Sequence, residues 1–234
     1  MTRTSLAKVL FIVVALASAF ATHGQPRIVT ESEIDDLVKA ATDARSLLAY
    51  RFRHSSFSAR PTETEETQTS VSIFEWVASD RWRHIIEYRP SSTSDLIRRE
   101  MIRIGDKRFA SQASGDWTVT PASSSDSHWG EARAALKVDS VECRYMGTEA
   151  MSGKTVDVFR KVAIYRTEQR SGPPTLGRMT TTFWFDKKGL LIKEDRLFDN
   201  AANTTPRTRY LWEYEYDPTI RIEQPVITNG TPRR

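Results

Sequence analysis

The sequence RWRHIIEYR, residues 81–89, alternates between two kinds of side chain. Trp82, His84, Ile86 and Tyr88 form one set, and the residues between them are charged at four of five positions. Successive side chains of a β-strand point to opposite faces of the sheet. The alternation therefore predicts a strand with one aromatic face and one solvated face.

The segment RYLWEYEY, residues 209–216, repeats this pattern with Tyr210, Trp212, Tyr214 and Tyr216 on one side. Further period-two segments predict strands at 50–58, 70–78, 97–104, 107–112, 117–120, 141–148, 154–166, 177–186 and 190–198. The total is about eleven strands. Trp117 restarts a strand directly after Gly115-Asp116, and we expect its indole to lie against the sheet.

Residues typical of tight turns separate these segments. They are Ser79-Asp80, Gly105-Asp106, Gly115-Asp116, Ser152-Gly153, Lys187-Lys188-Gly189 and Asp199-Asn200. Turns this short connect neighbouring antiparallel strands. We therefore expect one antiparallel sheet.

A helix is predicted to begin at Thr30-Glu31-Ser32-Glu33, which fits a capping box. Apolar residues then follow helical spacing and predict one covered stripe: Ile34, Leu37, Val38, Ala41, Ala44, Leu47 and Leu48. Residues 123–138 break the strand rhythm, and they are interpreted as a short second helix or a lid.

The first residues indicate export. A basic start, an apolar run at residues 9–20 and the triplet Ala19-Phe20-Ala21 predict a cleaved signal peptide over 1–21. We expect a linker at 22–29, a single domain at 30–227 and a flexible tail at 228–234. No cysteine lies near the cleavage site, which argues against a lipobox, and no other segment is apolar enough to span a bilayer. The mature protein is expected in the periplasm or secreted.

Charge and cysteine content argue against a nucleic-acid-binding protein and against a protein stabilised by intramolecular disulfides. The formal net charge is +4, and loss of Arg3 and Lys8 with the signal peptide reduces it to about +2. Nucleic acid is therefore not an expected partner. Cys143 is the only cysteine, so it forms no intramolecular disulfide, and it is interpreted as a small apolar core residue.

No catalytic or metal-binding pattern emerges. Gly153-Lys154-Thr155 resembles the end of a phosphate-binding loop, but position 148 is Thr where that loop needs Gly. The four histidines show no ligand spacing, and no nucleophile has the sequence context of a known catalytic set. We therefore predict no enzyme, no metal and no cofactor.

The arginines of the predicted strands have two interpretations. Arg51, Arg53, Arg81, Arg83, Arg98, Arg99 and Arg103 mostly alternate against apolar positions. This pattern favours a solvated outer face of the sheet, and the alternative is contact with anionic lipid or with a partner.

The aromatic residues also leave two alternatives open, because Tyr and Trp suit either a sheet core or the wall of an amphipathic ligand site. If a single helical stripe and a short second helix leave part of a large sheet uncovered, the aromatic residues line a ligand site. The candidate wall residues are Phe74, Trp76, Trp82, Ile86, Tyr88, Trp212, Tyr214 and Tyr216.

Several segments resemble motifs of the periplasmic lipoprotein-carrier superfamily, which includes LolA, LolB, the LppX-type lipid-binding proteins and the sensor domain of RseB-like regulators. They are FEWVASDRWRHIIEY, IRIGDKRFASQASGDWTV, GTEAMSGK and TTTFWFDKKGLLIKE. The resemblance implies an α+β fold: a strongly curved antiparallel sheet, an unclosed half-barrel, with the helices packed in its concave face.

The chain departs from individual members of this superfamily. Ala78-Ser79-Asp80 stands where LolA usually carries a proline, and Arg51 and Arg53 are both candidates for the arginine to which gating is attributed there. Without a lipobox the chain resembles neither LolB nor an anchored LppX-type protein. It is therefore interpreted as a relative rather than as LolA itself.

The resemblance implies a periplasmic carrier or chaperone that binds lipid or the acyl chains of lipoproteins in an apolar cavity, and that works as a monomer. The alternative is an RseB-like sensor of an envelope signal whose partner is a membrane-anchored regulator.

Overall fold

A computed structural model of the chain describes residues 25–60, 63, 65–89, 94–111, 116–123, 137–167, 175–200 and 207–227. The predicted signal peptide and C-terminal tail lie outside these residues, as does most of the segment 123–138 that was interpreted as a second helix or lid.

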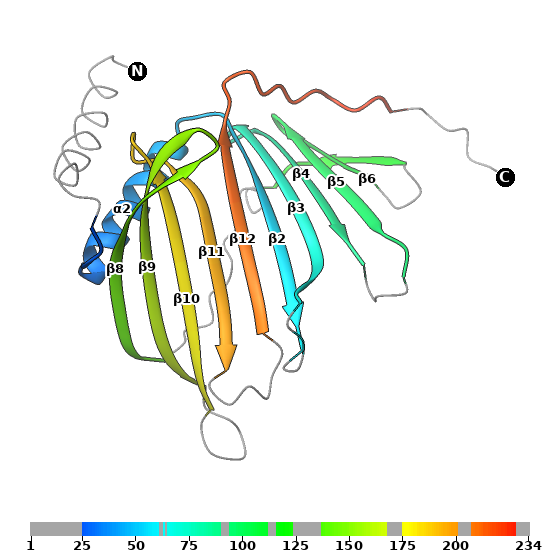
Figure 1. The fold of residues 1–234 in the computed structure, drawn as a ribbon. Helices are drawn as coiled ribbons and strands as arrows, with labels where there is room; N and C mark the ends of the chain where they lie inside the picture. Colours follow the sequence, from blue (N-terminus) through cyan, green and yellow to red (C-terminus); the bar gives the residue numbers. More distant parts are fainter. Residues whose placement is uncertain are drawn as a thin grey trace.

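The described part folds into one helix and one antiparallel sheet (Figure 1). The helix is α2 (Glu31–Arg45). The strands are β1 (Arg27–Ile28), β2 (Tyr50–Ala59), β3 (Thr67–Ala78), β4 (Arg81–Tyr88), β5 (Ile97–Ile104), β6 (Lys107–Ser111), β7 (Trp117–Pro121), β8 (Lys137–Met151), β9 (Lys154–Thr167), β10 (Thr175–Asp186), β11 (Leu191–Asn200) and β12 (Arg207–Tyr216).

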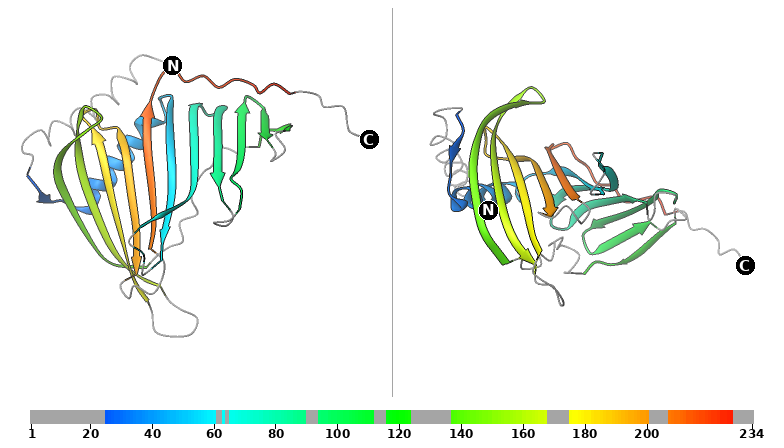
Figure 2. Two further views of the ribbon diagram at one scale, coloured as in Figure 1. Left: turned by 45° about the vertical axis from the view of Figure 1, so that its right-hand side comes forward. Right: turned by 60° about the horizontal axis from the view of Figure 1, so that its bottom comes forward.

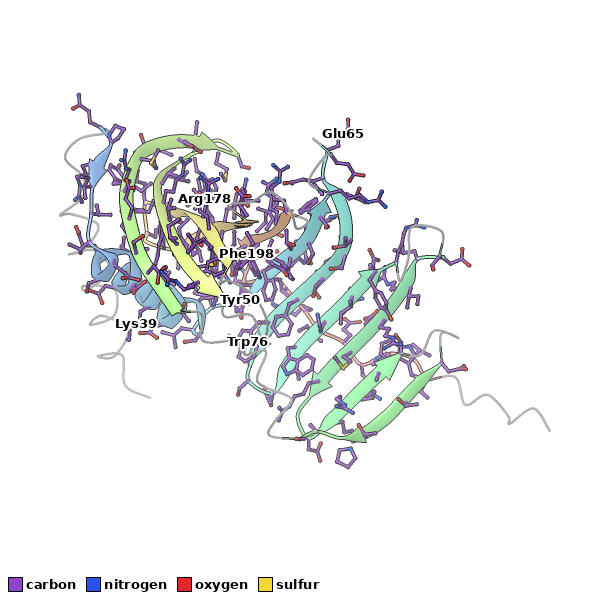
Figure 3. The ribbon with its side chains drawn as sticks, turned by 90° about the horizontal axis from the view of Figure 1, so that it is seen from below. Lys39, Tyr50, Glu65, Trp76, Arg178 and Phe198 are labelled. Carbon is purple, nitrogen blue, oxygen red and sulfur yellow. The ribbon has the colours of Figure 1, made fainter. Side chains whose placement is uncertain are left out.

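The strand order is β1-β8-β9-β10-β11-β12-β2-β3-β4-β5-β6-β7. Two meanders, β8 to β12 and β2 to β7, meet where β12 pairs with β2 over ten residue pairs, from Arg207↔Ala59 to Tyr216↔Tyr50. The sheet curves strongly without closing into a barrel, and α2 lies on the side toward which it curves (Figures 2 and 3). The predicted α+β half-barrel is confirmed. We call the side that carries α2 the inner face and the other side the outer face.

The capping box predicted for α2 is present. The Thr30 hydroxyl accepts a hydrogen bond from the Glu33 backbone N–H at 3.2 Å, and the Thr30 backbone N–H donates to the Glu33 carboxylate at 2.6 Å. Ile34 and Ala41 are buried in a cluster that includes Cys143, Tyr145 and other residues of β8 to β11. The helix therefore covers one end of the inner face.

Four local features differ from the sequence expectation. Leu47 and Leu48, expected on the covered stripe, are exposed because α2 ends at Arg45. Asp199 and Asn200, expected in a turn, still pair with Arg178 and Gly177 in β11 and β10. The strand β8 begins at Lys137 rather than near residue 141. Arg27–Ile28, expected in the linker, forms strand β1 and pairs with β8.

The chain after β12 covers part of the outer face. Ile220 and Ile222 are buried against Ile102 and Phe109, which pair across β5 and β6. Trp117 packs against the same cluster. Its indole therefore fixes the last strands of the sheet to the C-terminal segment.

Replacing Thr30 with alanine removes the hydroxyl of the capping box, and we expect the free energy of unfolding to fall by about 1 kcal/mol. Urea unfolding of Thr30→Ala measures this loss. The matched control is Ser32→Ala in the same first turn, whose hydroxyl reaches only Asp36 at 3.5 Å. Equal effects of the two substitutions would contradict the capping role.

Candidate functional site

The aromatic side chains of the two meanders meet on the inner face. The register places residues of β12, β2, β3 and β4 opposite one another in rows, so each row lies on one side of the sheet. The three rows are Tyr216, Tyr50, Trp76 and Trp82; Tyr214, Phe52, Phe74 and His84; and Trp212, His54, Ser72 and Ile86. Tyr88 follows in the next row, opposite Ser70.

All eight candidate wall residues therefore share one face, Phe74, Trp76, Trp82, Ile86, Tyr88, Trp212, Tyr214 and Tyr216. Figure 3 shows Tyr50 and Trp76 on the side of the sheet that carries α2. We call the aromatic and histidine members of the three rows the aromatic band.

The rings of the aromatic band contact one another across the strands. The ring centroids of Phe52 and Phe74 lie 5.3 Å apart, and those of Phe52 and Tyr214 lie 5.7 Å apart. His54 stacks on Trp212 at 4.7 Å with an interplanar angle of 11°. The band is continuous across the junction between β12 and β2.

Burial varies along the band. Phe74, Trp82 and Trp212 are buried, with 8 %, 2 % and 9 % of their surface exposed. The other five candidates, Trp76, Ile86, Tyr88, Tyr214 and Tyr216, are half-buried. The band thus combines anchored rings with rings that keep accessible surface.

Sequence reasoning missed Tyr50 and Phe52, which lie at the centre of the band. The signal was present, because YRFRH at residues 50–54 alternates aromatic or histidine side chains with arginines. Residues 50–58 were predicted as a strand, but their faces were not assigned.

Arg45, the last residue of α2, connects the helix to the aromatic band. Its guanidinium carbon lies 4.8 Å from the ring centroid of Tyr214 and 5.5 Å from that of Tyr50. Such cation–π contacts are favourable, and a cation at a helix C-terminus also complements the helix dipole. Arg51 and Arg53, the candidates from the sequence, lie instead on the outer face, opposite Glu75 and Ile73.

The tyrosines of the band remain neutral at physiological pH. Burial raises the pKa of Tyr214 to about 12, and burial also raises the pKa of Tyr216 and Tyr50. The Tyr216 hydroxyl donates a hydrogen bond to the Leu191 carbonyl at 2.8 Å. Their hydroxyls thus contribute polar tips without charge.

His84 is the most buried polar side chain of the band. Its Nε2 lies 2.6 Å from the Ser72 hydroxyl. Burial, assisted by the nearby His54, lowers the pKa of His84 to about 4. The imidazole is therefore neutral at pH 7.

The outer face of the same strands is charged. Arg51 pairs with Glu75 at 2.5 Å, Arg83 with Glu100 at 2.7 Å and Arg98 with Glu87 at 3.1 Å. These pairs connect β2, β3, β4 and β5. For these three arginines the predicted outer-face position is correct.

The described residues form neither a metal-ion site nor a membrane-spanning helix. No group of three His, Cys, Asp or Glu side chains there is placed to hold a metal ion. No helix in that part of the chain is both long and apolar enough to cross a membrane. Cys143 is buried beneath α2, and burial raises the pKa of its thiol.

Comparison with known proteins gives similarity in structure only. No protein-family model and no curated protein matches the chain. The structure is similar to LprF from Mycobacterium bovis, at 11 % identity and a TM-score of 0.44, over 85 % of this chain and 97 % of that one.

Two further solved structures are similar at 11 % identity. One is a LolA superfamily protein from Nitrosomonas europaea, with a TM-score of 0.30 over 83 % of this chain and 97 % of that one. The other is an outer membrane lipoprotein-sorting protein domain from Vibrio parahaemolyticus, with a TM-score of 0.27 over 80 % and 93 %. Because all three TM-scores are below 0.5, a function has to be inferred from the aromatic band itself.

The burial of neutral His84 makes stability depend on pH. Its folded pKa of about 4 lies below the unfolded value of 6.5, so the unfolded chain binds the proton more tightly. The free energy of unfolding is therefore expected to fall as the pH drops from about 6.5 to 4, by up to about 3 kcal/mol.

Urea unfolding at pH 7 and pH 4.5 measures this dependence. The variant His84→Gln keeps a polar side chain but cannot titrate, so its stability should change less between the two pH values. A pH dependence equal in the variant and the parent protein would contradict the assignment to His84.

Proposed function

We propose that this protein binds the acyl chains of a lipid or lipoprotein on the aromatic band and carries them through the periplasm. The observation that carries the proposal is the position of the band relative to α2. The helix packs against β8 and β11, whereas the band extends over β12, β2, β3 and β4. Apart from Arg45, which contacts Tyr214 and Tyr50, the only helix described thus covers β8 to β11 rather than the band.

An acyl chain suits this surface. Burial of apolar area contributes roughly 25 cal/mol per Å², or about 0.8 kcal/mol for each methylene. A chain laid along half-buried rings such as Tyr50, Trp76 and Tyr216 would remove apolar surface on both partners from water. Because this contribution is not directional, we expect several chain lengths to bind.

A carrier function also fits the chemistry of the Ser72–His84 pair. A serine hydroxyl next to an imidazole resembles a nucleophile with its base, but an effective general base needs a pKa near the working pH. The pKa of His84 is about 4, so it would be a weak base at neutral pH. We interpret the pair as a hydrogen bond that satisfies two buried polar groups.

Export is part of this proposal and rests on the predicted signal peptide over 1–21 and on the absence of a lipobox there. An exported carrier without its own anchor would move a bound chain between two membranes. Native mass spectrometry of protein purified without detergent from the periplasm should show bound lipid.

A matched pair of substitutions on β2 tests the band. Phe52 lies on the inner face against Phe74, and Phe57 lies opposite Arg209 with the guanidinium carbon 5.7 Å from its ring centroid. We expect Phe52→Ser to weaken binding of a fluorescent fatty-acyl probe about tenfold, because a large apolar contact is lost. Phe57→Ser should leave the probe affinity unchanged.

Thermal unfolding of both variants controls for lost stability. Failure of the parent protein to bind the probe or to carry lipid would contradict the carrier function. Equal losses of affinity in two folded variants would contradict binding at the band. Crosslinking in cells tests the alternative, since a sensor should capture one membrane-anchored regulator and a carrier should capture many acylated clients.

A further inference from the structure

The first row of the aromatic band continues beyond β4 into two arginines. Trp76 lies opposite Trp82, Trp82 lies opposite Arg103, and Arg103 lies opposite Arg108 on β6. Because directly opposed residues share a face, both arginines belong to the inner face. The row thus changes from aromatic to cationic over the width of two strands, about 10 Å.

The two arginines oppose each other directly, which is an unfavourable arrangement. Residues directly opposite in an antiparallel pair have Cβ atoms about 5 Å apart, and like charges there are destabilising. Two positively charged side chains thus extend from directly opposed positions of the inner face on β5 and β6.

Arg103 donates two long hydrogen bonds to backbone carbonyls. Its Nε donates to the Gly105 carbonyl at 3.3 Å and its Nη1 to the Ser123 carbonyl at 3.4 Å. Next to it in the row, the buried Trp82 Nε1 has no hydrogen-bond partner among the described residues. These donors favour an anionic group with several acceptor oxygens, because hydrogen bonds to a charged partner are the stronger ones.

We propose that the ligand of the aromatic band is a lipid with an anionic phosphate headgroup, which Arg103 and Arg108 bind while the acyl chain lies on the rings. This inference rests on the proposed carrier function and adds the class of headgroup. Arginine is suited to this role because its planar guanidinium binds phosphate through two parallel hydrogen bonds. A third arginine on the same face, Arg99, contacts Tyr88, with its guanidinium carbon 6.0 Å from the ring centroid.

The test compares ligands that share one chain. Dodecyl phosphate and dodecanol, each below its critical micelle concentration, compete with a fluorescent fatty-acyl probe for the parent protein. We expect dodecyl phosphate to bind at least tenfold more tightly, and its advantage to shrink as the salt concentration rises, because salt screens charges that solvent can reach. This comparison needs no variant.

Substitution then locates the headgroup. In Arg103→Gln and Arg108→Gln the advantage of dodecyl phosphate should fall about tenfold, the effect of losing one charge-assisted hydrogen bond. The affinity for dodecanol should stay unchanged. The control is Arg53→Gln, which removes an exposed arginine of the outer face and should alter neither affinity.

The outcomes separate the two proposals. If neither dodecyl compound displaces the probe, the carrier function itself fails. If both bind equally well, or if the arginine variants keep the full preference for phosphate, the chain-binding function stands and the headgroup assignment is overturned.

Discussion

The pairing of β12 with β2 is the interaction on which the rest of the molecule depends. These strands are separated by about 150 residues of sequence, yet they pair over ten positions and join two meanders into one sheet. The register of this pairing sets Tyr214 against Phe52 and Tyr216 against Tyr50. A shift by one residue would move Tyr50, Phe52 and His54 of β2 to the outer face, because side chains alternate along a strand. The face on which the aromatic band lies therefore depends on this register.

The two faces of the central strands carry different kinds of side chain. On the outer face, acidic and basic side chains alternate from strand to strand, and Glu75 lies between Arg51 and Arg83. On the inner face, rings stack beside neutral His84 and Tyr214, and the ion pair of Arg196 with Glu194 lies against Trp212. At β5 and β6 the inner face carries two directly opposed arginines, Arg103 and Arg108. An apolar surface that ends in positive charge is complementary to an amphipathic anion, whose apolar chain ends in a negative charge.

Two segments cover the sheet from opposite sides and at opposite ends. The helix α2 buries the inner face of β8 to β11, and the chain after β12 buries the outer face of β5 and β6. The centre of the inner face lies between these covers, where Arg45 is the side chain that links the helix to the rings. A sheet of twelve strands held by a single described helix thus keeps apolar area that its own elements leave half-buried.

The sequence by itself determined most of the local features of this fold that depend on neighbouring residues. Period-two alternation located the strands to within a few residues, turn residues made them antiparallel, and Thr30 and Glu33 fixed the start of α2. It could not determine that β12 lies beside β2, that Trp117 packs against Ile220 and Ile222, or that Arg103 opposes Arg108. Those contacts join residues far apart in the chain or depend on which side of a strand faces inward. The tertiary structure decided them, because pairing between strands fixes register and face together, whereas alternation within one strand shows only that two faces exist.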